Sequence, residues 1–112
     1  MSVTPVLLKK TNTTHGTRTQ VTSDTTIKPI SVYFEPLRTN TGEIYIGDSA
    51  VSATNYMARL TIPSATNNPS FAMSGTPGNR IGGTGVQLSN LYIDSSVDGD
   101  IVLITYVYEQ GG

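Results

Sequence analysis

The sequence predicts an all-β protein: a single-domain antiparallel β-sandwich or jelly roll with little or no helix. Short runs in which apolar and polar residues alternate are typical of half-buried strands. Turn residues separate these runs at intervals of about 8–12 residues, as in sandwiches and barrels. The chain of 112 residues contains 17 threonines, and threonine suits a pleated, half-wet surface because it is β-branched.

The first regular strands lie in the middle of the chain. Apolar and polar residues alternate over 30–35 and again over 43–46, and the turn residues of 39–42 stand between them. This arrangement predicts a β-hairpin. Residues 57–62 alternate in the same way, and residues 17–22 predict a less regular strand.

The C-terminal part predicts a second hairpin. Residues 91–94 alternate, Asp98-Gly99 is a turn dipeptide, and residues 101–108 follow as the final strand. Both faces of that final strand are apolar, so we expect both to be buried. One face is expected to contact the core of the domain and the other a second layer or a partner subunit.

Two segments are less regular. Residues 1–12 predict either an extended N-terminal arm or an edge strand, and residues 13–112 form the sandwich domain. Within that domain, residues 63–85 are rich in Pro, Gly, Asn and Ser and predict a long loop in which Phe71 and Met73 act as anchors. Loops of this length are usually functional, mobile or provided with short strands of their own.

Composition and charge exclude several classes of protein. The absence of cysteine excludes disulfides, cysteine zinc sites and thiol chemistry. The net charge of −1, without a basic stripe, argues against a nucleic-acid partner. No stretch approaches the roughly 20 apolar residues of a membrane helix, and no signal peptide follows Met1. We therefore expect a protein made in a cytoplasm, with no membrane partner.

The sequence contains no motif that predicts catalysis, so we expect no enzyme, no catalytic residue and no cofactor. His15 is the single histidine and lies in a polar stretch without a nucleophile motif. Glu35 and Glu43 flank a predicted turn, where solvated strand ends are favoured over an acid–base pair. The glycines of 75–85 do not match a phosphate-binding loop.

Three aspartates close together deserve comparison with a cation site. Asp94, Asp98 and Asp100 lie within seven residues and offer oxygen ligands that suit Ca²⁺. Their spacing differs from an EF-hand loop. An aspartate-rich turn needs the same side chains for bonds to the backbone, with Gly99 at positive φ, and we favour the turn over a metal site.

The apolar and tyrosine side chains predict contacts with other molecules. Tyr33, Tyr45 and Tyr92 fall on the strand faces opposite the aliphatic residues, where they would contact a subunit or, as an alternative, stack on a sugar. We favour the subunit contact. The predicted interface residues are Val3, Val6, Leu7, Leu8, Tyr33, Tyr45, Phe71, Met73, Tyr92, Tyr106 and Tyr108.

Two motifs carry a resemblance to a family. Residues 39–48 read TNTGEIYIGD and residues 88–100 read LSNLYIDSSVDGD. They resemble small virion proteins of tailed bacteriophages, in which a TNTG-x-IYIGDS-x-V hairpin precedes an LSNLYIDSSVDGD hairpin and a final hydrophobic strand. The likeness covers residues 30–52 and 86–108, and the sequence departs from it between Pro63 and Gly85, where a shorter connection is expected in the related chains.

The resemblance implies a β-sandwich or jelly roll on the virion and no catalytic residues. It implies a capsid decoration (cement) protein that binds the outer shell, bridges major capsid subunits and associates with itself, with a trimer preferred. The outer face of the final strand, with Tyr106 and Tyr108, would supply the subunit contact. The alternatives are a tail, baseplate or head–tail connector component and, in a different class, a carbohydrate-binding β-sandwich.

Overall fold

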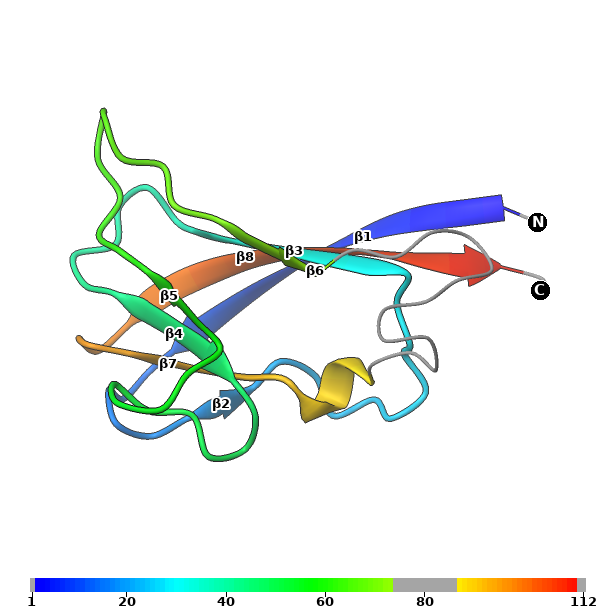
Figure 1. Ribbon diagram of the computed structural model, residues 1–112, viewed down its shortest axis with the longest axis horizontal. Coiled ribbons are helices and arrows are strands. Elements are labelled where there is room, and N and C mark those ends of the chain that lie inside the picture. Colours follow the sequence, from blue (N-terminus) through cyan, green and yellow to red (C-terminus); the bar gives the residue numbers. More distant parts are fainter. Residues whose placement is uncertain (1, 74–86, 111–112) are drawn as a thin grey trace.

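Two four-stranded antiparallel sheets face each other and form a β-sandwich (Figure 1). The computed structural model describes residues 2–73 and 87–110, and the side chains of residues 4–73 and 87–108. The strands are β1 (Ser2–Asn12), β2 (Thr19–Gln20), β3 (Ser31–Pro36), β4 (Ile44–Gly47), β5 (Ala58–Leu60), β6 (Phe71–Met73), β7 (Tyr92–Ser95) and β8 (Asp100–Gln110). Among the described residues the helical content is one 3-10 turn, Leu88–Asn90.

The strand order is that of a jelly roll. Sheet A has the order β1-β8-β3-β6, and sheet B has the order β2-β7-β4-β5. The ladders therefore join the first strand to the last, the second to the seventh, the third to the sixth and the fourth to the fifth. The chain thus forms one long antiparallel ribbon that is folded over into two sheets, the eight-strand double-sheet architecture of a jelly roll.

This topology overturns both predicted hairpins. β3 lies in sheet A and β4 in sheet B, and likewise β7 lies in sheet B and β8 in sheet A. The turn residues between these strands carry the chain across the sandwich instead of reversing it within one sheet. β4 and β5 are the only consecutive described strands that pair with each other.

The N-terminal segment is an edge strand and not a free arm. β1 pairs with β8 from Ser2↔Gln110 to Asn12↔Asp100, in register over its whole length. Pro5 lacks an amide hydrogen, and proline and lysine on an edge strand discourage pairing with foreign strands. Lys9 and Lys10 add charge to the same edge.

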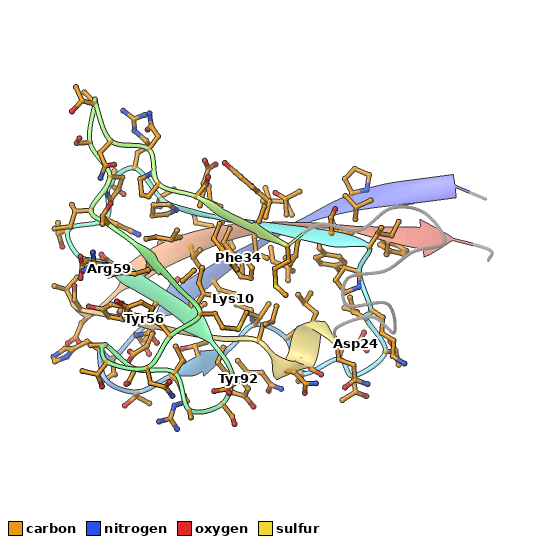
Figure 2. The ribbon with its side chains drawn as sticks, in the orientation of Figure 1. Lys10, Asp24, Phe34, Tyr56, Arg59 and Tyr92 are labelled. Carbon is orange, nitrogen blue, oxygen red and sulfur yellow. The ribbon has the colours of Figure 1, made fainter. Side chains whose placement is uncertain are left out.

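The core lies between the sheets and follows the period-2 alternation of the strands. Phe34, labelled in Figure 2, is fully buried. Its ring centroid lies 6.0 Å from that of Phe71. The remaining buried members of the core cluster are Val21, Val32, Ile44, Ile46, Leu60, Leu88, Leu91, Ile93, Val102, Ile104 and Tyr106. Tyr106 thus belongs to the core, which corrects its assignment to the outer face of the final strand.

The described part of the long loop contains a short strand. Residues 63–70 are irregular, and β6 then pairs with β3 through Val32↔Met73 and Phe34↔Phe71. Both Phe71 and Met73 pack partly buried against the core. Residues 74–86, the rest of the predicted loop, lie outside the described residues.

Candidate interaction surfaces

The aspartates of the candidate calcium site bond to two segments of the chain, Asp94 and Asp98 to residues 12–16 and Asp100 to residues 41–42. Asp94 Oδ1 accepts hydrogen bonds from Gly16 N at 2.9 Å and from Asn12 Nδ2 at 3.1 Å. Asp98 Oδ1 accepts one from His15 N at 2.9 Å. Asp94 therefore holds the loop after β1 against β7.

Asp100 joins the start of β8 to the loop between β3 and β4. Its Oδ2 accepts a hydrogen bond from Gly42 N at 2.8 Å, and its Oδ1 accepts one from Thr41 N at 3.2 Å. A side chain at Gly42 would collide with the Ser96 hydroxyl and the Val97 side chain. Glycine is needed at this position because the two loops approach so closely.

Asn40 extends the ladder between β3 and β8 after β3 has turned away. Its Nδ2 donates to Ile101 O at 2.6 Å, and its Oδ1 accepts from Ile101 N at 2.9 Å. The side-chain amide thus satisfies the backbone of β8 as a neighbouring strand would. Asn40 is 8% exposed. Asn12, Asn40, Gly42, Asp94 and Asp100 together form what we call the clasp.

The aspartates of this region bond to the backbone, as expected for a turn, but their partners lie in distant loops. Gly99 has a φ of +82° and donates from its N to Asn12 O at 2.8 Å. Within residues 2–73 and 87–110, no three His, Cys, Asp or Glu side chains gather in a way that could hold a metal ion. His15 is an exposed loop residue whose Nε2 lies 3.8 Å from Asp98 Oδ1.

The outer face of sheet B is covered by loops of the same chain. Tyr45 is only 5% exposed, because Tyr56 from the β4–β5 loop stacks on its ring with centroids 5.6 Å apart. The Tyr45 hydroxyl donates to Glu43 Oε1 at 3.1 Å, and Arg59 Nη1 lies 3.6 Å from Glu43 Oε2. Burial, followed by this bond to Glu43, raises the pKa of Tyr45. Figure 2 shows Tyr56 and Arg59 on this side of the molecule, and Tyr92 is half-buried on the same strand face.

The outer face of sheet A is covered less: among the described residues, the segment between β5 and β6 borders it at the corner of Glu35 and Leu103. Leu7 is 64% exposed and Tyr33 is 41% exposed. The ladder aligns them in one row, because Leu7 is opposite Thr105 and Thr105 is opposite Tyr33. Apolar residues surround this row along β8, which presents Ile101, Leu103 and Val107 half-buried to the same side.

A cavity opens between sheet A and the connection from β2 to β3, at the end where β8 finishes. Its volume is about 370 Å³, and its lining residues among those described are Val6, Asp24, Thr26, Ile27, Lys28, Tyr106 and Tyr108. The rings of Tyr106 and Tyr108 lie 6.2 Å apart and are tilted by 40°. Burial, and then the neighbouring Tyr108, raise the pKa of Tyr106. Hydrogen bonds from Thr26 Oγ1 and N lower the pKa of the Asp24 carboxyl.

The structure separates the predicted interface residues into three groups. Leu7 and Tyr33 share the outer face of sheet A, whereas Tyr45 and Tyr92 lie on the outer face of sheet B. The inward group packs against the core and consists of Val6, Leu8, Phe71, Met73, Tyr106 and Tyr108. The side chain of Val3 lies outside the described residues.

Sequence reasoning missed several residues of the exposed face of sheet A. Ile101, Leu103 and Val107 lie on it, although the final strand was expected to present Tyr106 and Tyr108 there. Counting in steps of two from a core residue of β8 would have found them, since outward and inward positions alternate. No pattern in the sequence predicts that Lys9 and Glu35 lie near each other on this face, because their proximity depends on which strands pair. The possible pair of Glu35 and Glu43 is divided between the two sheets.

Comparisons with protein-family models, curated proteins and solved structures found no match for the chain. Across residues 2–73 and 87–110, no helix has the length and apolar character needed to cross a membrane. The strand order shows an all-β sandwich of the jelly-roll type.

Replacing Asn40 tests the clasp. Asn40→Ala removes both bonds to Ile101 and leaves the partly buried Ile101 N without its acceptor, whereas Ile101 O keeps the bond from Leu37 N. We therefore expect a loss of about 1–3 kcal/mol in the free energy of unfolding. Asn55→Ala is the matched control, because Asn55 Nδ2 donates to Ala50 O within an exposed loop. Urea unfolding measures both variants. Equal losses would contradict a special role for Asn40.

Two tyrosines of similar exposure test the cover of sheet B. Tyr56 is 43% exposed and stacked on Tyr45, whereas Tyr33 is 41% exposed without a ring contact among those described. An aromatic pair adds about 0.5–1.5 kcal/mol beyond its buried area, so Tyr56→Ala should destabilise the protein by about 1 kcal/mol more than Tyr33→Ala. Thermal unfolding at two protein concentrations measures this difference and separates it from self-association. A larger loss for Tyr33→Ala would refute it.

Proposed function

We propose that this protein is a virion structural protein, a capsid decoration (cement) protein that binds the outer shell and bridges major capsid subunits. The observation that carries the proposal is the relation between the two motifs that resemble tailed-phage virion proteins. Residues 39–48 and 88–100 are far apart in sequence, yet Asp100 of the second accepts hydrogen bonds from Thr41 and Gly42 of the first. Ser96 N also donates to Glu43 O at 3.0 Å.

The motifs therefore describe one structural unit, the junction that holds the two sheets together. A resemblance that includes both halves of that unit supports a shared architecture more strongly than two independent turns would. Jelly rolls occur in viral capsid proteins, and also in lectins and cupins. The step from fold to capsid is an analogy, since one fold serves many functions.

The surface suits a protein that acts in many copies. Thr, Ser and Asn side chains favour polar, water-containing contacts, and a regular array of weak sites gains strength through avidity. The proposal includes the major capsid protein and further copies of this chain as partners, with a trimer preferred from the sequence. It assigns the protein to the capsid surface, after synthesis in the host cytoplasm, and assigns it no catalytic role.

Quantitative mass spectrometry of purified virions tests the location. A decoration protein should be present in hundreds of copies in proportion to the major capsid protein, because it follows the symmetry of the shell. Cryo-electron microscopy of the same particles should show density on the outer surface. About a dozen copies or fewer per particle, consistent with the symmetry of a tail or connector, would instead establish the alternative of a tail, baseplate or head–tail component.

One observation favours carbohydrate binding as a second candidate function. The cavity of about 370 Å³ combines two tyrosines with Asp24, Thr26 and Lys28. Sugars are bound by apolar ring faces together with a few placed polar groups. Asp24 Oδ1 accepts hydrogen bonds from Thr26 N and Oγ1, which orient the carboxylate so that Oδ2 can accept a hydrogen bond from a sugar hydroxyl. This site differs from the tyrosine strand faces and the Asp94–Asp100 turn considered from the sequence.

Calorimetry with sugars selected on a glycan array tests this second function. Asp24→Ala should weaken any binding at the cavity at least tenfold. Asp48→Ala should leave it unchanged, because Asp48 accepts its hydrogen bond from Ala50 N in the exposed loop between β4 and β5. Absence of binding at millimolar sugar would eliminate this candidate.

A further inference from the structure

We infer that the outer face of sheet A binds a second copy of this chain, related to the first by a two-fold axis parallel to β8. The inference concerns self-association alone and does not depend on the proposed capsid role. It rests on the apolar character of the face, on the order of charges across it and on the contrast with sheet B.

The apolar part of the face runs along its two longest strands. β1 and β8 each span 11 residues and pair throughout. Pro5 and Leu7 of β1 are exposed, and β8 contributes residues half-buried at the same surface. Tyr33 and Ala72 continue the row of Leu7 on the far side of β8. Apolar surface that is contiguous over several strands is typical of an interaction site.

Two residues of opposite charge, Lys9 and Glu35, lie on either side of the central strand β8. The ladder places Lys9 opposite Leu103, and Leu103 opposite Glu35. β8 therefore separates the lysine from the glutamate, and the two backbones lie two strand spacings apart, about 10 Å. Both side chains are exposed.

This order of charges makes the face complementary to itself. Rotation by 180° about an axis above β8 and parallel to it exchanges the side of β1 with the side of β3. Lys9 of one copy then lies over Glu35 of the other, and the same pair forms a second time. Near the axis, Leu103 of one copy faces Leu103 of the other. Leu7 of each copy faces Tyr33 of the other. Sheets that pack face to face lie about 10 Å apart, a gap that a lysine and a glutamate side chain span together.

A two-fold pair explains the face better than the trimer preferred from the sequence. In a cyclic trimer each contact joins two different patches, whereas a single self-complementary patch is the mark of a two-fold interface. Exposed ion pairs add little affinity. We therefore attribute the affinity of the dimer to the apolar residues of the face, and the alignment of the two copies to Lys9 and Glu35.

The surroundings of Glu35 leave room for the incoming lysine. An open groove of about 300 Å³ borders this corner of the face, and Glu35, Leu103, Pro63, Asn68 and Pro69 are among its lining residues. The groove lies between the sheet and the segment that connects β5 to β6, which rises at one end of the molecule in Figure 1. On sheet B the corresponding strand face is already occupied, since Tyr56 covers Tyr45.

Charge exchange between Lys9 and Glu35 tests the pair. Sedimentation velocity of the full chain should show a concentration-dependent dimer. Lys9→Glu and Glu35→Lys should each weaken it at least tenfold, because each places like charges together twice. An equimolar mixture of the two variants should form a heterodimer, since both contacts are then attractive, and the double variant should regain the homodimer. Native mass spectrometry with one variant labelled with ¹⁵N identifies the heterodimer.

Lys28→Glu is the matched control, because Lys28 is exposed and lies in the loop before β3 and not on the outer face of sheet A. It makes the same change in net charge as Lys9→Glu and should leave the dimer unchanged. Circular dichroism confirms that each variant is folded. A monomer at every concentration, a trimer, or a mixture that fails to associate would each overturn the inference.

Discussion

The architecture depends on the place where the chain leaves β3 and crosses to the other sheet. There the Asn40 side chain forms two hydrogen bonds with the backbone of Ile101. In a jelly roll nearly every connection passes from one sheet to the other, so the loops at the ends of the sandwich have to hold the sheets in register. Asn40 does this by standing in for a strand at the end of β3, and Asp100 binds the backbone of the next two residues. The close approach of these loops requires glycine at position 42. Polar side chains thus add to the apolar core at this end of the sandwich, because they satisfy backbone groups that the crossing loops leave open.

The two outer faces of the sandwich differ because the loops are distributed unevenly. The loop between β4 and β5 returns over sheet B, where Tyr56 buries Tyr45 and where Glu43 and Arg59 complete a polar network. On sheet A, Leu7 and Tyr33 stay exposed within an apolar surface. Leaving such a surface in water is unfavourable unless a partner covers it. This asymmetry is the physical basis for the inference that a second copy of the chain covers sheet A.

Prediction from the sequence succeeded where a pattern is local. Alternation along residues 30–35 and 43–46 located two strands within one or two residues, because side chains of a strand point alternately to opposite faces. The continuous apolar run 101–108 located the final strand equally well. The turn at Gly99 was also recognisable, since positive φ at glycine is a local property. The partners of the aspartates were not, because Asp98 and Asp100 bond to the backbone of loops far away in the sequence. The pairing of the strands could not be recognised from the sequence. A turn sequence between two strands fits both a hairpin and a crossing between sheets, and the choice depends on which distant strand offers a better partner.

The sequence by itself determined that this protein is built of short strands and turns, because period-2 alternation and turn chemistry act within a few residues. It also determined that the final strand would be apolar on both faces. Only the tertiary structure decided which face holds Tyr106 and which holds Leu103, because the inward side is set by the packing of one sheet on the other. The tertiary structure likewise placed Lys9 and Glu35 on either side of Leu103. These residues come from opposite ends and the middle of the chain, and no local rule relates them.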